Sequence, residues 1–163
     1  MSIVVSDTSP IRAFHFLKEI DLLRQLFGSV IVPSAVAIEL TQPHPSFQPV
    51  DLSLIPFVEI RTPQDLQRVA HYAATLDAGE AEAIALAVEL GAMLLIDETA
   101  GRAEAAAQGV PFVSVLGVLA RAKRERLIVE VRPLVDRLRI ELRFHIGQEL
   151  YEQFLQAIGE GPR

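Results

Sequence analysis

The chain contains no cysteine among its 163 residues. This absence excludes disulfides, zinc sites with thiolate ligands and catalysis by a thiol. No apolar run reaches the roughly 18 residues that a helix needs to span a bilayer. The first residues enter a strand pattern directly, without the basic stretch that begins a secretory signal, so we expect no such signal. These absences together predict a cytoplasmic protein with no membrane segment.

Positive charge is also scarce, since 15 lysines and arginines face 21 acidic residues, giving a net charge of −6. Proteins that bind nucleic acid usually carry a basic surface. A bound metal would reverse the local sign of a group of acids, which leaves that function open. The basic residues gather late in the chain, and such runs are most often solvated helix faces. They are Arg121, Lys123, Arg124, Arg126, Arg132, Arg137, Arg139 and Arg143.

Apolar segments alternate along the chain with segments of helical periodicity. Half of the residues are hydrophobic (50%), which suits one compact domain, residues 1–163, with a sizeable core. The alternation predicts a three-layer α/β/α sandwich with a central parallel sheet of about four to five strands. Strands are predicted at residues 3–6, 29–33, 57–63, 93–97 and 111–115, with 57–63 at an edge.

The tail at residues 129–158 has helical periodicity, and we expect a helical C-terminal extension there. Four of its apolar residues recur at every fourth position, which predicts a stripe that packs on the core or on another subunit. The final residues 159–163 are expected to fray. The stripe consists of Leu134, Leu138, Leu142 and Ile146.

Acidic residues stand where predicted strands end or helices begin. Asp7 follows the first strand, and Asp97 ends the apolar run at residues 93–97. The carboxyl ends of parallel strands and the N-termini of helices leave a crevice where ligands bind. Glu39 and Glu80 lie on predicted helices that could reach the same crevice. Oxygen ligands of this kind suit hard divalent cations such as Mg²⁺ or Mn²⁺.

Four motifs support a family resemblance. They are a first strand ending in D-T-S, a glutamate in the helix after V-P-x-x-V, an acid-led helix with A-x-A-x-E-L-G, and an apolar strand ending in aspartate. With these motifs the segment Ile3–Leu119 resembles a PIN domain, and it is most similar to a prokaryotic PIN-like group related to the VapC-like toxin ribonucleases.

The resemblance implies a metal-dependent ribonuclease that hydrolyses phosphodiester bonds of single-stranded RNA, with one or two Mg²⁺ or Mn²⁺ ions. It also implies the toxin of a toxin/antitoxin pair, a homodimer and a small antitoxin protein as partner. The residues that match the family's acids are Asp7, Glu39, Glu80 and Asp97. Glu98 replaces a second aspartate often present in the family.

The third acid has competitors, because Glu80 and Glu82 lie two positions apart and point in different directions on a helix. Counting back from the E-L-G motif aligns Glu80 with the family acid. Asp77 and Glu82 remain alternatives.

Polar residues near the aspartates are candidates for substrate binding. Thr8 and Ser9 could donate hydrogen bonds to phosphate or to Asp7, or could only cap the following helix. Arg12 and Arg102 each lie one turn into a helix and could clamp a phosphate, although single arginines are more often surface residues.

A second functional class stays open. A PIN-fold protein that has lost catalysis could serve as a binding or regulatory module for RNA or a protein. The acidic balance favours this module, whereas four retained carboxylates oppose it, because they would repel one another without a metal.

Overall fold

The computed structural model describes residues 3–162, and its framework is a parallel sheet of five strands in the order β3-β2-β1-β4-β5. The number of strands and the edge position of β3 agree with the sequence prediction. All neighbouring pairs are parallel. The strands are β1 (Val4–Ser6), β2 (Val30–Pro33), β3 (Val58–Arg61), β4 (Met93–Leu95) and β5 (Phe112–Val113).

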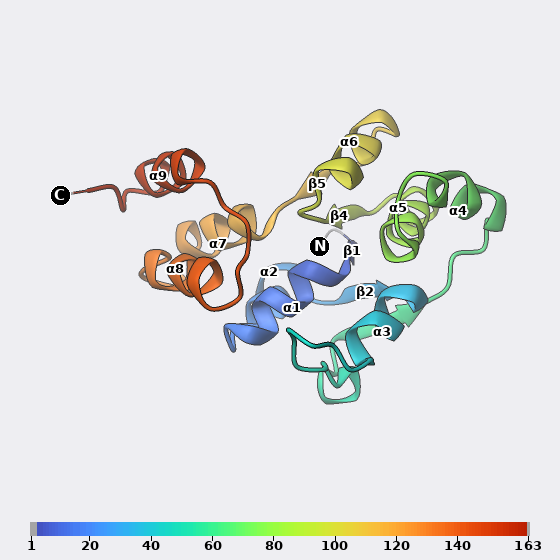
Figure 1. Cartoon of the computed structure of the whole chain (residues 1–163), viewed down its shortest axis with the longest axis horizontal. Coiled ribbons are helices and arrows are strands. Elements are labelled where there is room, and N and C mark those ends of the chain that lie inside the picture. Colours follow the sequence, from blue (N-terminus) through green and yellow to red (C-terminus); the bar gives the residue numbers. More distant parts are fainter. Residues whose placement is uncertain (1–2, 163) are drawn as a thin grey trace.

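Helices connect these strands and cover both faces of the sheet, which confirms the three-layer α/β/α architecture (Figure 1). The first helical segment is divided into α1 and α2. The helices are α1 (Thr8–Phe16), α2 (Asp21–Phe27), α3 (Ser34–Thr41), α4 (Leu66–Ala73), α5 (Ala78–Leu90), α6 (Thr99–Ala107), α7 (Val115–Arg124), α8 (Arg132–Ile140) and α9 (Gln148–Ala157), with a 3₁₀ turn, η1 (Leu52–Leu54).

Successive residues of the central strands serve opposite cores, because side chains alternate along a strand. Val4 of β1 packs in a cluster with α1, α2, α7 and α8, whereas Val5 packs with α4, α5 and α6. Ile31 of β2 belongs to the second cluster, and its neighbours Val30 and Val32 belong to the first. Both faces are therefore covered, which explains why the strands are continuously apolar in sequence.

The helical tail consists of two helices, α8 and α9. Helix α8 ends at Ile140, and a left-handed residue, Arg143 (φ 54°), lies in the turn before α9. The helix therefore ends at Ile140, although the apolar repeat of four in the sequence continues beyond it. The apolar residues of the stripe still pack in or against the first core cluster: Leu134, Leu138, Leu142 and Ile146. Figure 1 shows α7, α8 and α9 at one end of the molecule and α4 and α5 at the other.

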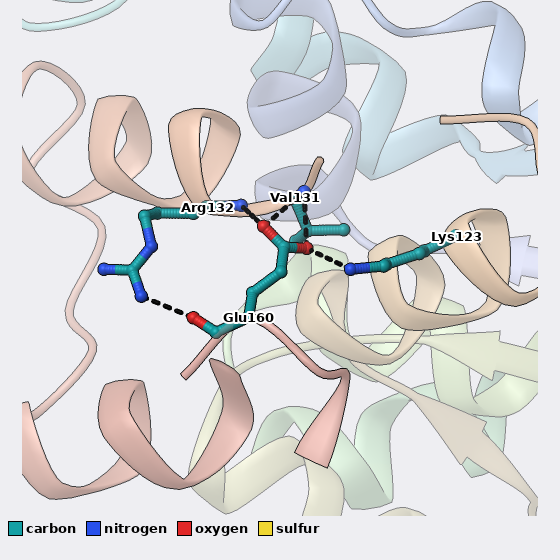
Figure 2. Close-up of polar contacts among 4 residues, drawn as sticks. All are labelled: Lys123, Val131, Arg132 and Glu160. Carbon is teal, nitrogen blue, oxygen red and sulfur yellow. Dashed lines mark hydrogen bonds and ion pairs between the residues drawn. The ribbon is translucent and has the colours of Figure 1, made fainter. Parts of the chain in front are cut away.

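Glu160 holds the last described residues in place. Its carboxylate accepts hydrogen bonds from the backbone N–H groups of Val131 (2.9 Å) and Arg132 (2.9 Å) and from Lys123 Nζ (2.8 Å). The Arg132 guanidinium donates to the Glu160 carbonyl (Figure 2). The predicted fraying is therefore wrong at Glu160, and Arg163 lies outside the described residues.

These contacts tie α7, the start of α8 and the end of α9 to one carboxylate. An anion at the N-terminus of α8 also complements the helix dipole. Burial by itself would raise the pKa of Glu160, but the hydrogen bonds from Lys123, Arg132 and Val131 hold it below its ordinary value.

Replacing Glu160 by glutamine should lower the free energy of unfolding by about 1–3 kcal/mol at neutral pH, because hydrogen bonds to a charged group are lost. Urea denaturation measures this loss. The pKa of Glu160 is lowered on folding, so the difference from wild type should shrink as the pH falls through that lowered pKa. Glu141→Gln, at an exposed ion pair with Arg137, is the control and should change little. Equal losses in the two variants would contradict the role given to Glu160.

Candidate active site

Two aspartates lie at the centre of the carboxyl edge of the sheet. Asp7 follows β1 and Asp97 follows β4, and these strands are neighbours with Ser6 opposite Leu95. The Asp7 N–H donates to the Leu95 carbonyl at 3.0 Å. The strand order reverses between β1 and β4, and such a switch point is where ligands bind in open α/β sheets. The structure thus places both aspartates where the sequence predicted.

Asp7 is buried (4% exposed), and its side chain makes no capping hydrogen bond to α1. The helices α3 and α5 bring other groups towards it. A Cβ atom at Gly79 would lie 3.5 Å from Asp7 Oδ1 and 3.3 Å from Glu39 Oε2. Both carboxylates therefore border one small space, which stays open because residue 79 has no side chain.

Glu80 also belongs to this buried region (7% exposed). At the start of α5 its N–H donates to Asp77 Oδ1 at 2.8 Å, and its own carboxylate accepts from the Asp77 N–H at 3.3 Å. A Cβ at Gly101 of α6 would lie 3.8 Å from the Glu80 carboxyl carbon. We call Asp7, Glu39 and Glu80 the acidic cluster.

The alternatives to Glu80 have structural partners. Glu82 accepts hydrogen bonds from the Ser34 hydroxyl (2.8 Å) and the Ala35 N–H (3.1 Å), so it caps the start of α3. Asp77 is the N-cap of α5. Of the charges that act on Asp7, that of Glu80 raises its pKa most, followed by Asp77 and Glu39. These contacts favour Glu80 over both alternatives.

Burial dominates the electrostatics of the site. It raises the pKa of Asp7 to about 7, opposed by the backbone N–H of Thr8 and reinforced by the charges of the other acids. Burial likewise raises the pKa of Glu80, with a further contribution from Asp77. The site therefore favours either protons or a bound cation near neutral pH.

Asp97 is also partly buried and lacks a full set of hydrogen-bond partners. Its Oδ1 accepts from the Val115 N–H at 3.2 Å, whereas its buried Oδ2 has no hydrogen-bond partner within the described part of the chain. Burial raises the pKa of Asp97 to about 6, although the Val115 N–H and Arg102 oppose the change. A buried oxygen without a partner is unusual in a folded protein and is consistent with a ligand.

The predicted substrate-binding residues separate into two groups. Thr8 donates its hydroxyl to Glu39 Oε2 at 2.7 Å, so it fixes a member of the acidic cluster. Ser9, Arg12 and Arg102 line a cleft of about 570 Å³ that also contains Asp97. Of these, Arg12 donates to the Glu39 carbonyl at 3.0 Å.

Residues of the turn between α8 and α9 also line this cleft, and sequence reasoning did not assign this turn to the site. We call the cavity the arginine cleft. Arg143 was noted only as a member of a basic run, and nothing in the spacing of residues pairs this turn with Asp97. The cleft is lined among others by Ser9, Arg12, Asp97, Arg102, Arg143 and His145.

The donor groups at this edge of the sheet are of the kind that a hard divalent cation prefers. All are oxygens, Asp97 Oδ2 is buried without a partner, and the space at Gly79 is open to two carboxylates. Within residues 3–162, no group of three or more acids or histidines is already arranged to hold a metal ion. The residues fit such an ion in chemistry, and Asp7 and Glu80 are buried whereas Glu39 is exposed. Binding the ion would require their carboxylates to reorient.

Comparison with known proteins gives one positive result. A family model of the PIN domain matches residues 3–160. A search of curated proteins found no match. Among residues 3–162, no helix combines the length and apolar character needed to cross a membrane.

The buried charge of Asp7 predicts an unusual pH dependence of stability in metal-free protein. Its pKa is higher in the folded than in the unfolded state, so ionisation should destabilise the fold as the pH rises from about 4 to 7. Asp7→Asn should remove this penalty and gain about 1–4 kcal/mol near pH 7.5, with little gain near pH 4.

Denaturation with a chelator present, at both pH values, measures the effect. Asp21→Asn is the control, because Asp21 is exposed and Arg24 donates to it at 2.6 Å, which lowers its pKa to about 2. The control should not gain stability. The same pH dependence of the free energy of unfolding in the wild type and in Asp7→Asn would contradict the raised pKa of Asp7.

Proposed function

The chain belongs to the PIN-domain family, and from this premise we propose that it is a metal-dependent ribonuclease that hydrolyses phosphodiester bonds of single-stranded RNA. PIN domains have a nuclease-type fold and are generally hydrolases that act on nucleic acid. The observation that supports the proposal best is the acidic cluster at the switch point of the sheet, next to the strand end that carries Asp97. Two of its members, Asp7 and Glu80, are buried, and none of the three forms an ion pair within residues 3–162.

Asp7, Glu39, Glu80 and Asp97 would hold Mg²⁺ or Mn²⁺. When bound, such an ion makes a water more acidic and stabilises negative charge on the phosphate oxygens. The chain's own groups orient these ligands. Thr8 holds Glu39, and the Val115 N–H holds Asp97.

The arginine cleft is the proposed path of the substrate. Ser9, Arg12 and Arg102 would bind phosphates there, and guanidinium groups suit this task because two N–H groups can bond one phosphate. A splayed single strand can enter such a cleft more easily than a duplex, which favours single-stranded RNA.

Family membership also supports a proposal for the cellular role and the partners of the protein. We propose a cytoplasmic toxin of a toxin/antitoxin pair, acting as a homodimer and restrained by a small antitoxin protein. The enzymatic activity and the partners are separate proposals, and cleavage of RNA by the purified protein tests only the activity.

Two observations favour a second function. No metal-holding group is preformed in residues 3–162, and the net charge of −6 opposes nucleic acid. A catalytically inactive PIN-fold module that binds RNA or protein would need no metal-holding group, and a module that binds protein would also be compatible with the negative charge.

Mn²⁺ binding by calorimetry, together with cleavage of single-stranded RNA by the same samples, distinguishes these functions. The wild type should bind Mn²⁺ and cleave, and Asp7→Asn and Asp97→Asn should lose both, with cleavage falling at least about 100-fold because the ion stabilises developing charge. Glu82→Gln is the matched control and should retain both, because the amide oxygen can still cap α3.

A wild type that binds no Mn²⁺ would overturn the nuclease and favour the module. Loss of binding in Glu82→Gln but not in Asp7→Asn would overturn the assignment of ligands.

A further inference from the structure

We propose that the turn between α8 and α9, residues 141–147, forms a phosphate-binding wall of the arginine cleft, in which Arg143 binds the substrate strand beside the acidic cluster. This proposal rests on the proposed function for its substrate class, single-stranded RNA. It assigns a binding residue that lies more than 40 positions after Asp97 in the sequence.

The first argument is charge. Five arginines elsewhere in the described structure pair with acids, as Arg121 does with Glu125, whereas four others form no ion pair. Those four are Arg124, Arg126, Arg132 and Arg139. The three arginines that line the cleft form no ion pair within residues 3–162, although the protein has an excess of acids. They are Arg12, Arg102 and Arg143.

Burial strengthens this argument. The Nε atoms of Arg12 and Arg102 are inaccessible to solvent and have no hydrogen-bond partner among the described residues. Buried donors are normally satisfied, and each arginine is a strong ligand for an anion. Three arginines without an ion pair line one cleft, and in two of them the Nε atom lacks a partner, although Arg12 also donates to the Glu39 carbonyl. This concentration of positive charge points to a polyanion in the cleft.

The second argument is that the turn has defined anchors. The Phe144 N–H donates to the Leu138 carbonyl at 2.8 Å, and Ile146 is buried in the core. Beyond the turn, α9 is fixed through Glu160 to Lys123 and the start of α8 (Figure 2). The wall that carries Arg143 is thus held against the body of the protein at both ends.

The third argument is the mixture of charge and aromatic surface. Phe47 and Phe144 are half-buried, and both line the cleft. The Arg12 guanidinium lies 4.6 Å from the centre of the Phe47 ring. Sites for single-stranded nucleic acid combine a basic groove with aromatic rings on which bases stack. A purely anionic small ligand would not require the rings.

The test measures binding without catalysis. A fluorescein-labelled single-stranded RNA of about 12 nucleotides is titrated with protein in EDTA, and anisotropy is followed between about 50 and 200 mM salt. Arg143→Ala should weaken binding about fivefold, and the slope of log K against log salt should fall by about 0.7, the value for one phosphate contact on a single strand. Arg143→Lys should restore the slope, because it keeps the charge.

Arg126→Ala is the matched control, since Arg126 is also exposed, left-handed (φ 63°) and outside the cleft. It should bind like wild type. Wild-type behaviour of Arg143→Ala, an equal loss in Arg126→Ala, or no binding by the wild type would each overturn the proposal. RNA binding with the predicted slopes but no cleavage in Mn²⁺ would leave the wall in place and contradict the nuclease.

Discussion

Burying a carboxylate removes it from water, and this cost must be offset by hydrogen bonds, by a cation or by a proton. Asp7 is buried in the middle of the sheet edge, and Glu39 and Glu80 add charge of the same sign around it. The described chain offers backbone N–H groups and hydroxyls there, but no lysine or arginine forms an ion pair with the three acids. Near neutral pH these acids therefore favour either a proton or a bound cation.

The fold can tolerate the cost of burying these carboxylates because the two apolar cores supply its stability. Two apolar clusters cover the two faces of the sheet, and the strands between them contribute side chains to each cluster in alternation. Close contacts then define the site. Gly79 lets α5 approach Asp7 and Glu39, and Gly101 brings α6 against Ile96, where a Cβ would lie 2.5 Å from Ile96 Cδ1. Rigid packing thus holds the carboxylates near one another despite their repulsion.

Sequence reasoning predicted the architecture and the placement of the aspartates, because both follow from local patterns. An apolar strand that ends in an acid puts Asp7 and Asp97 at one edge once the strands are parallel and adjacent. Periodicity carries no information on contacts between distant segments. The bond from Thr8 to Glu39 spans 31 positions, and that from Lys123 to Glu160 spans 37. The turn at Arg143 could not be predicted either. The apolar repeat of four continues through this turn, so the pattern gives no sign that the helix ends.

The most direct test of the central claim, that the buried acids are ligands of a divalent cation, is anomalous X-ray diffraction from crystals soaked in Mn²⁺. The account predicts an anomalous peak at the carboxyl edge of the sheet, within coordination distance of Asp7 and of at least one of Glu39, Glu80 and Asp97. Saturating Mn²⁺ that produces no peak at this edge, or a peak only at remote surface acids, would contradict it.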